Sequence, residues 1–139
     1  MTIDDTAPVA GRLKPGITLS ADDYERLSGL AHAAMSRMPQ LATELAAELD
    51  RALVLADGSL PQDTVCMNGA VEFRDDTTGK VQTVTLVYPA DADILQGRIS
   101  VLTPVGTALI GLRAGQSISW YTPSGEPRQL TVLRAVAPG

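Results

Sequence analysis

The chain has 139 residues and a formal net charge of -5 at pH 7, and 45% of its residues are hydrophobic. This length and hydrophobic content fit one small folded domain with an appendage and exclude disorder for the chain as a whole. An acidic chain does not offer the basic surface that binds nucleic-acid phosphates. We therefore expect no direct sequence-specific binding of nucleic acid, and a protein partner instead.

The chain has one cysteine, Cys66, and one histidine, His32. They can build neither a disulfide framework nor a zinc site with four side-chain ligands, so we expect no metal and no cofactor. We interpret His32 as a helix-surface residue and Cys66 as a small core residue. Residues 1–16 carry no secretion signal, and no apolar run approaches about 20 residues, so we expect a cytoplasmic protein without a membrane span.

Two helices are predicted in the first part of the chain. Residues 1–16 have no periodicity and are interpreted as a flexible lead-in. Ser20 and Asp23 approximate a capping box that begins a helix over 21–35. After Pro39 a second apolar stripe, which ends with Ala52 and Leu53, predicts a helix of about 15 residues. Residues 17–56 should therefore form an antiparallel helical hairpin.

From residue 57 the pattern changes to short strands, which predicts a separate sheet domain over 57–139. With the hairpin it makes an α+β fold, in which the sheet is antiparallel and carries one short helix. The predicted strands are 65–67, 70–74, 81–88, 99–102, 117–122 and 128–136.

The stretch SVLTPVGTALIGLRAGQ, residues 100–116, contains Gly106 and Gly111 at the spacing of a phosphate-binding loop. Such a loop needs Lys and then Ser or Thr after the second glycine, where this chain has Leu112 and Arg113. Thr103 and Pro104 instead predict an N-cap and first residue of a short helix. Gly111 suits the left-handed residue that ends it.

Two acidic pairs, Asp75 with Asp76 and Asp91 with Asp93, lie in predicted turns. A calcium loop needs a longer series of oxygen ligands, so we interpret both pairs as solvated turn residues. Trp120 and Tyr121 are neighbours on a predicted strand and should face opposite sides of the sheet. One should enter the core, and the other should offer an exposed aromatic contact.

A family likeness is carried by the helical hairpin and three later motifs: VCMNGAVEF at 65–73, TLVYPADAD at 85–93 and ISVLTPVGTALIGLRAG at 99–115. Over 17–136 the chain resembles the Gre superfamily of bacterial transcription factors, and within it the Rnk branch of nucleoside diphosphate kinase regulators. The resemblance implies an FKBP-like C-terminal domain that docks on bacterial RNA polymerase beside its secondary channel, and a coiled coil that points into the channel. The expected partner-binding residues are Ser100, Thr103, Pro104, Val105, Gly106, Trp120 and Tyr121.

In the Gre cleavage factors, acidic residues at the coiled-coil tip help to hold a catalytic magnesium ion. The corresponding tip here, Ser36, Arg37, Met38, Pro39 and Gln40, has no carboxylate and one positive charge. A helix of roughly 15 residues is only ~23 Å long, which is short for a finger that must reach the active site. We therefore expect a monomeric, non-enzymatic regulator that competes with Gre-type factors.

Two alternatives remain. An FKBP-like fold raises the possibility of a prolyl isomerase or chaperone-like protein, although a chain with 4% aromatic residues can hardly line the pocket of such an enzyme. The name of the Rnk branch suggests a direct modulator of nucleoside diphosphate kinase.

Overall fold

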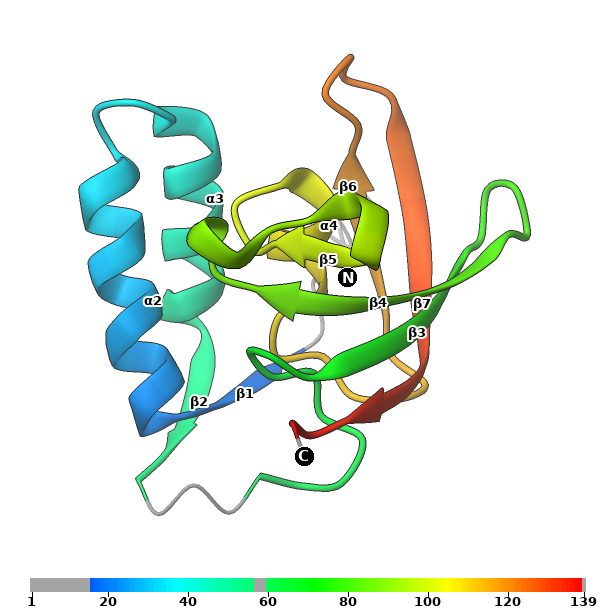
Figure 1. Cartoon of the computed structure of the whole chain (residues 1–139), viewed down its shortest axis with the longest axis horizontal. Coiled ribbons are helices and arrows are strands. Elements are labelled where there is room, and N and C mark those ends of the chain that lie inside the picture. Colours follow the sequence, from blue (N-terminus) through cyan, green and yellow to red (C-terminus); the bar gives the residue numbers. More distant parts are fainter. Residues whose placement is uncertain (1–15, 57–59, 139) are drawn as a thin grey trace, which may run out of the picture.

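The computed structural model describes residues 16–56 and 60–138. The predicted lead-in, apart from Gly16, lies outside the described residues. Two helices, α2 (Ala21–Ala34) and α3 (Pro39–Asp50), lie side by side and form the predicted hairpin (Figure 1). Strands β1 (Ile17–Ser20) and β2 (Ala52–Leu55) flank this pair at its base.

The ends of the helices follow from local chemistry. The Ser20 hydroxyl oxygen accepts a hydrogen bond from the Asp23 N–H at 3.1 Å, which confirms the predicted N-cap of α2. Pro39 is the first residue of α3, where its missing N–H costs nothing. The prediction that this helix includes Ala52 and Leu53 was wrong, because both residues belong to β2.

Strands β1 and β2 were not predicted. They form a parallel two-stranded sheet in which Ile17 pairs with Ala52 and Ser20 with Leu55. Their partners are more than 30 residues apart in sequence, so the pairing depends on the hairpin that brings them together.

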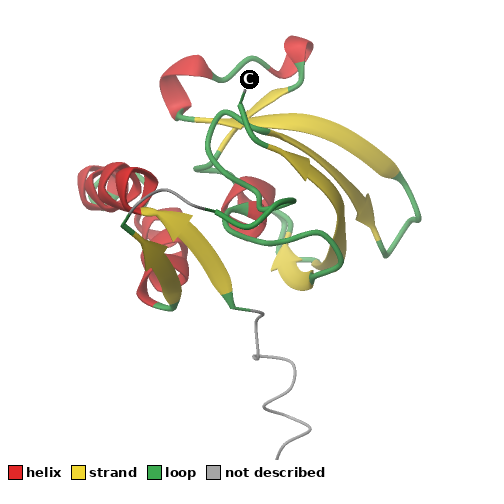
Figure 2. Cartoon of the chain, turned by 90° about the horizontal axis from the view of Figure 1, so that it is seen from below, coloured by secondary structure: helices red, strands yellow, loops and turns green. Residues whose placement is uncertain are grey.

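The second part of the chain is a curved five-stranded sheet, seen from below in Figure 2. The strand order is β5-β4-β3-β7-β6. The predicted α+β class is confirmed, but the sheet is mixed rather than antiparallel because β4 and β5 pair in parallel. Its strands are β3 (Ala70–Asp75), β4 (Val81–Val87), β5 (Arg98–Ser100), β6 (Ser117–Tyr121) and β7 (Pro127–Val136).

Two strand predictions need correction. Residues 65–67 are not a strand, although the Val65 N–H donates to the Leu112 carbonyl at 2.7 Å and the Gly111 N–H donates to the Val65 carbonyl at 3.0 Å. The strand predicted over 99–102 is shorter, because it ends at Ser100 where the chain turns toward the short helix α4 (Pro104–Leu109).

A single hydrophobic cluster joins the hairpin to the sheet. It includes Leu27 and Leu45 from the helices, Leu109 from α4, and Phe73 and Leu130 from the sheet. Helix α4 contacts both α3 and β6 and lies between the two parts of the molecule (Figure 2). Among the described residues, no helix is long and apolar enough to cross a membrane.

Candidate functional site

The predicted docking element, residues 100–106, is a tightly hydrogen-bonded turn between β5 and α4. The Thr103 hydroxyl donates to the Ser100 carbonyl at 2.7 Å and accepts from the Gly106 N–H at 3.0 Å. The Ser100 hydroxyl accepts from the Leu102 N–H at 3.0 Å. Pro104 is the first helical residue, as predicted. Three hydrogen bonds within the segment thus stabilise this conformation of the turn.

The two glycines that suggested a phosphate loop are needed by the fold. A Cβ atom on Gly106 would lie 2.2 Å from the Ser100 carbonyl oxygen. Gly111 has a φ of +80°, and a Cβ there would lie 2.7 Å from the Ile17 Cβ. The Thr18 N–H also donates to the Gly111 carbonyl at 3.1 Å. These glycines let the turn close and let β1 approach α4.

The predicted contact residues differ in exposure. Thr103, Pro104 and Val105 are half-buried, and Gly106 is buried. Trp120 is half-buried against the core, whereas the side chain of Tyr121 is 61% exposed. This confirms that one aromatic faces the core and the other faces outward. Helix α4 packs on β6, so the turn and the aromatic strand belong to neighbouring elements.

The hairpin tip consists of the turn from Met35 to Met38 and the first residues of α3. The N–H groups of Arg37 and Met38 both donate to the Ala34 carbonyl, at 3.1 and 2.8 Å, and close the turn. All residues from Met35 to Gln40 are exposed. The tip therefore presents one guanidinium and two thioethers to its surroundings and no carboxylate.

The interpretation of the acidic pair in the β3–β4 turn as solvated was wrong for Asp75, whereas Asp76 is exposed. Asp75 is buried, and its carboxylate accepts hydrogen bonds from the Thr77 N–H at 2.8 Å and from Arg128 at 2.9 Å. Although partial burial acts to raise the pKa of Asp75, the hydrogen bonds from Thr77, Arg128 and Thr78 bring it below its usual value. Asp75 has a structural role in the turn. Asp91 and Asp93 are exposed, as predicted.

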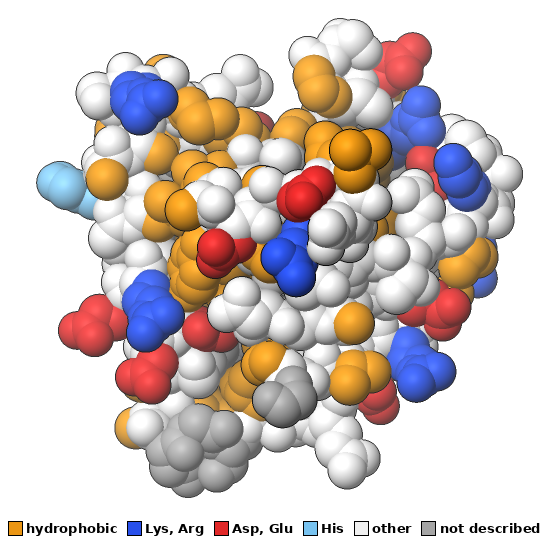
Figure 3. All heavy atoms as spheres, viewed as in Figure 1, with side chains coloured by type: hydrophobic (Ala, Val, Ile, Leu, Met, Phe, Trp, Pro, Cys, Tyr) orange, Lys and Arg blue, Asp and Glu red, His pale blue; other side chains and the backbone are white. Residues whose placement is uncertain are grey.

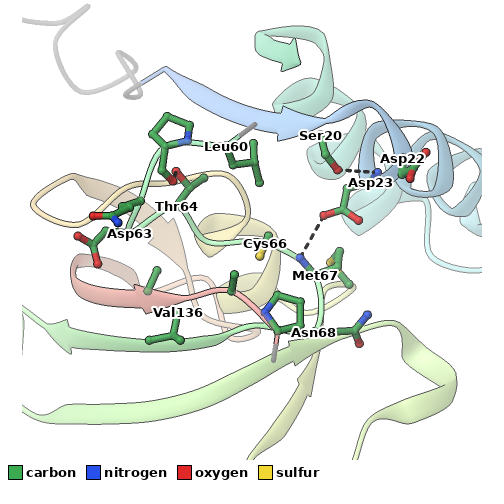
Figure 4. A pocket seen from close by; sticks show the side chains of 15 residues that line it. Ser20, Asp22, Asp23, Leu60, Asp63, Thr64, Cys66, Met67, Asn68 and Val136 are labelled. Carbon is green, nitrogen blue, oxygen red and sulfur yellow. Dashed lines mark hydrogen bonds between the residues drawn. The ribbon is translucent and has the colours of Figure 1, made fainter. Parts of the chain in front are cut away.

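Sequence reasoning missed a hollow of about 730 Å³ between the first turn of α2, the loop 60–68 and the end of β7 (Figure 4). The Asp23 carboxylate crosses this junction and accepts a hydrogen bond from the Met67 N–H at 3.3 Å. Burial raises the pKa of Asp23 despite that hydrogen bond and the nearby Arg26. The spacing of Ser20 and Asp23 predicted a helix N-cap. The hydrogen bond between Asp23 and Met67, which connects the hairpin to the loop before the sheet, depends on the tertiary fold.

The lone thiol and imidazole do not form a catalytic pair. Cys66 is buried beside the hollow, and burial raises the pKa of its thiol, which disfavours the nucleophilic thiolate. His32 is exposed on α2 and lines a different groove, with Met35 and Leu49. Within the described part of the chain, no group of three or more His, Cys, Asp or Glu side chains could hold a metal ion.

Two family profiles match the chain. The profile described as Rnk N-terminus matches residues 15–55, and the profile described as transcription elongation factor, GreA/GreB, C-term, matches residues 60–136. The chain belongs to the GreA/GreB family. The first match ends at residue 55 and the second begins at residue 60, and the predicted domain boundary at residue 57 lies between them.

The chain is similar to GreA/GreB-family proteins with several different names. The chain is 41% identical over 120 residues to the regulator of nucleoside diphosphate kinase of Escherichia coli K12, covering 86% of this chain and 88% of that protein. It is 35% identical over 111 residues to the transcription inhibitor protein Gfh1 of Thermus aquaticus, covering 77% and 69%. A solved structure of a prokaryotic transcription elongation factor GreA/GreB from Nitrosomonas europaea has a TM-score of 0.69 and 37% identity, covering 89% of this chain and 100% of that one.

Proposed function

We propose that this protein is a non-enzymatic transcription regulator that binds bacterial RNA polymerase near its secondary channel and competes with Gre-type cleavage factors. The C-terminal domain docks through Ser100, Thr103, Pro104, Val105, Gly106, Trp120 and Tyr121. The hairpin points toward the channel and occupies it without catalysing cleavage of the transcript.

The observation that carries this proposal is a carboxylate-free hairpin tip on a C-terminal domain of the GreA/GreB family. The longer helix, α2, has 14 residues and is therefore about 21 Å long. The tip brings Arg37 where metal binding would need acidic ligands. A short finger with a cationic tip can block a channel, but it cannot hold a magnesium ion.

Binding to purified bacterial core RNA polymerase tests the proposal. We expect association at micromolar concentration, displacement of a bound Gre-type factor, and no cleavage of the transcript in a stalled elongation complex. Absence of binding at micromolar concentration would reject the proposal, and cleavage by this protein would reject its non-enzymatic part.

A substitution in the docking turn tests the predicted contact. Pro104→Ala removes a side chain that presets the first turn of α4, while alanine is acceptable in a helix. A docking role predicts weaker polymerase binding with little change in melting temperature. Equal loss of binding and stability would make Pro104 structural, and loss of neither would move the contact elsewhere.

A second candidate function is direct modulation of nucleoside diphosphate kinase. It is favoured by the name of the Escherichia coli relative, which is 41% identical. Co-elution of the two purified proteins in the absence of transcription would support direct contact. An effect confined to the expression level of the kinase would contradict it.

A further inference from the structure

The most exposed large hydrophobic side chains among the described residues are Leu95 and Ile94, at 97% and 83%. They are neighbours on the one-turn 3-10 helix η2 (Ile94–Gln96), which lies just before β5 in the sequence. We call this pair the Ile94–Leu95 knob. Elsewhere in the described chain, the exposed fraction of large hydrophobic side chains reaches at most 62%, at Leu53.

The knob stands on a base closed by backbone hydrogen bonds. The N–H of Asp93 donates to the Arg98 carbonyl, and the N–H of Arg98 donates to the Asp93 carbonyl, both at 2.9 Å. The Gly97 N–H donates to the Ile94 carbonyl at 3.0 Å, and the Thr85 N–H donates to the Gly97 carbonyl at 2.8 Å. The turn is thereby fastened to β4, so a partner that covers it does not need to order it first.

The surroundings of the knob are polar and carry both signs of charge. Asp91 and Asp93 precede it and Arg98 follows it, and all three side chains are exposed. Figure 2 shows the short helical turns of this segment standing outside the sheet. Figure 3 shows hydrophobic side chains at the surface of this face, with carboxylate and basic groups beside them. The knob is a convex apolar tip next to two carboxylates.

We propose that the Ile94–Leu95 knob is an apolar anchor that inserts into a hollow on RNA polymerase whose rim carries Lys or Arg side chains. This inference rests on the proposed function. Two carboxylates and one guanidinium complement a basic rim better than an acidic one. An apolar centre with a polar rim is also the usual anatomy of a protein interface.

The same features disfavour other occupants. Nucleic-acid phosphates would be repelled by Asp91 and Asp93, and aliphatic side chains offer no ring on which bases stack. Two knobs meeting tip to tip would bury far less surface than the roughly 800 Å² per partner of a stable interface. Insertion of the knob into the hollow at Asp22, Asp23 and Asp63 of a second copy would bring like charges together.

The knob also relates to the docking turn proposed above. Strand β5 separates the two, with Ile94 and Leu95 before its first residue and Ser100 at its last. Pro104 and Val105 are half-buried and leave little apolar area for a partner. The knob supplies the apolar contact that the docking turn lacks, and both lie along one edge of the sheet.

Affinity for bacterial core RNA polymerase, measured by titration with a fluorescently labelled chain, tests the anchor. The double variant Ile94→Ser with Leu95→Ser should bind about tenfold more weakly or worse and keep the wild-type melting temperature, because neither side chain is buried. The matched control Leu53→Ser removes an exposed leucine from β2 and should leave the affinity unchanged.

A charge variant tests the rim. Asp91→Asn with Asp93→Asn should weaken binding severalfold and flatten its dependence on salt. Tighter binding by this variant would contradict the proposal that Lys or Arg side chains line the rim of the hollow on the polymerase.

The outcomes separate this inference from the proposed function. If the wild type binds and the double serine variant binds equally well, the anchor is wrong and the function stands. If the wild type does not bind at all, the proposed function fails first. A wild type that is dimeric by light scattering and a double serine variant that is monomeric would assign the knob to self-association and overturn the anchor.

Discussion

At the scale of single residues, the glycines of the 100–111 segment show how a motif can be read in two ways. Their spacing resembles that of a phosphate-binding loop. At each position, however, a Cβ atom would clash with a neighbouring part of the chain. Gly106 faces the Ser100 carbonyl, and Gly111 faces Ile17. The steric demand of close backbone approach explains both, and no anion is needed.

Substitution of Gly106 should therefore be costly. Gly106→Ala places a Cβ 2.2 Å from the Ser100 oxygen, so we expect a loss of about 1–3 kcal/mol in the free energy of unfolding. Gly29→Ala is the matched control, because Gly29 lies in α2 with nothing within 4 Å of its Cβ position. It should gain about 0.5–1 kcal/mol. Urea denaturation measures both, and equal effects would contradict the steric explanation.

Asp23 gives a pH-dependent prediction at the same scale. Because burial raises its pKa above the ordinary 3.8, the folded chain binds this proton at a higher pH than the unfolded chain does. The stability that this difference contributes is fully present below the unfolded pKa and is lost as the pH rises through the folded pKa. Asp22, Arg26, Cys66 and Tyr88 are the titratable groups around it.

Asp23→Asn keeps an oxygen that can accept from the Met67 N–H, but it cannot titrate. At pH 7 the free energy of unfolding of the variant should equal or exceed that of the wild type. As the pH falls to about 4, the wild type should gain stability relative to the variant, because its folded state takes up the proton more readily. Urea denaturation at several pH values measures this. The control Asp22→Asn changes an exposed neighbour in the same helical turn. A difference between wild type and Asp23→Asn that does not vary with pH would contradict the desolvated environment.

At the scale of elements, the hairpin is held by apolar stripes that meet across its two helices. Leu27 and Ala31 of α2 and Leu45 and Leu49 of α3 are all buried in the common core. The apolar stripes were predicted correctly at these four positions because helical periodicity is a local property of the sequence, whereas the predicted end of the second stripe lies in β2. The helix ends are also set locally, by Ser20 and Pro39.

Leu45→Ala should destabilise the protein by about 2–4 kcal/mol, because Leu45 has no exposed surface and its removal leaves a cavity. Glu44→Ala, which changes the exposed neighbour on the same helix, should have little effect. Thermal unfolding followed by circular dichroism measures both. Since the hairpin and sheet share one core, we expect a single transition, and a sheet that unfolds at its wild-type temperature would argue against a shared core.

At the scale of the whole molecule, the position of the hairpin follows from its contacts with the rest of the chain. Asp23 bonds to Met67, Thr18 bonds to Gly111, and α3 packs on α4. The tip therefore projects a set distance from the C-terminal domain. In the proposed function this distance decides how far the protein reaches into the polymerase channel.

Acidic residues at the tip should not restore cleavage. Met38→Asp with Gln40→Glu adds two exposed carboxylates, but the longer helix still spans only about 21 Å. We expect no transcript cleavage in a stalled elongation complex, with a Gre cleavage factor as the positive control. Cleavage by the variant would show that the hairpin is long enough, and that only the chemistry of its tip separates this protein from the Gre cleavage factors.

Local features of this protein could be predicted from its sequence. The caps at Ser20 and Thr103 and the start of α3 at Pro39 depend on groups within a few residues of one another. Such interactions form wherever the segment is placed. The turn at 100–106 was predicted for the same reason, since the Thr103 hydroxyl hydrogen-bonds to Ser100 and Gly106 in its own segment and Pro104 begins α4.

Features that join distant segments were decided only by the tertiary structure. The pairing of β1 with β2, the parallel approach of β5 to β4 and the bond from Asp23 to Met67 each need two segments that the fold brings together. Exposure is decided in the same way. Ile94 and Leu95 belong to a residue type that is usually buried, but the turn that connects β4 to β5 leaves them uncovered, because burial depends on what packs above a side chain and not on its own polarity.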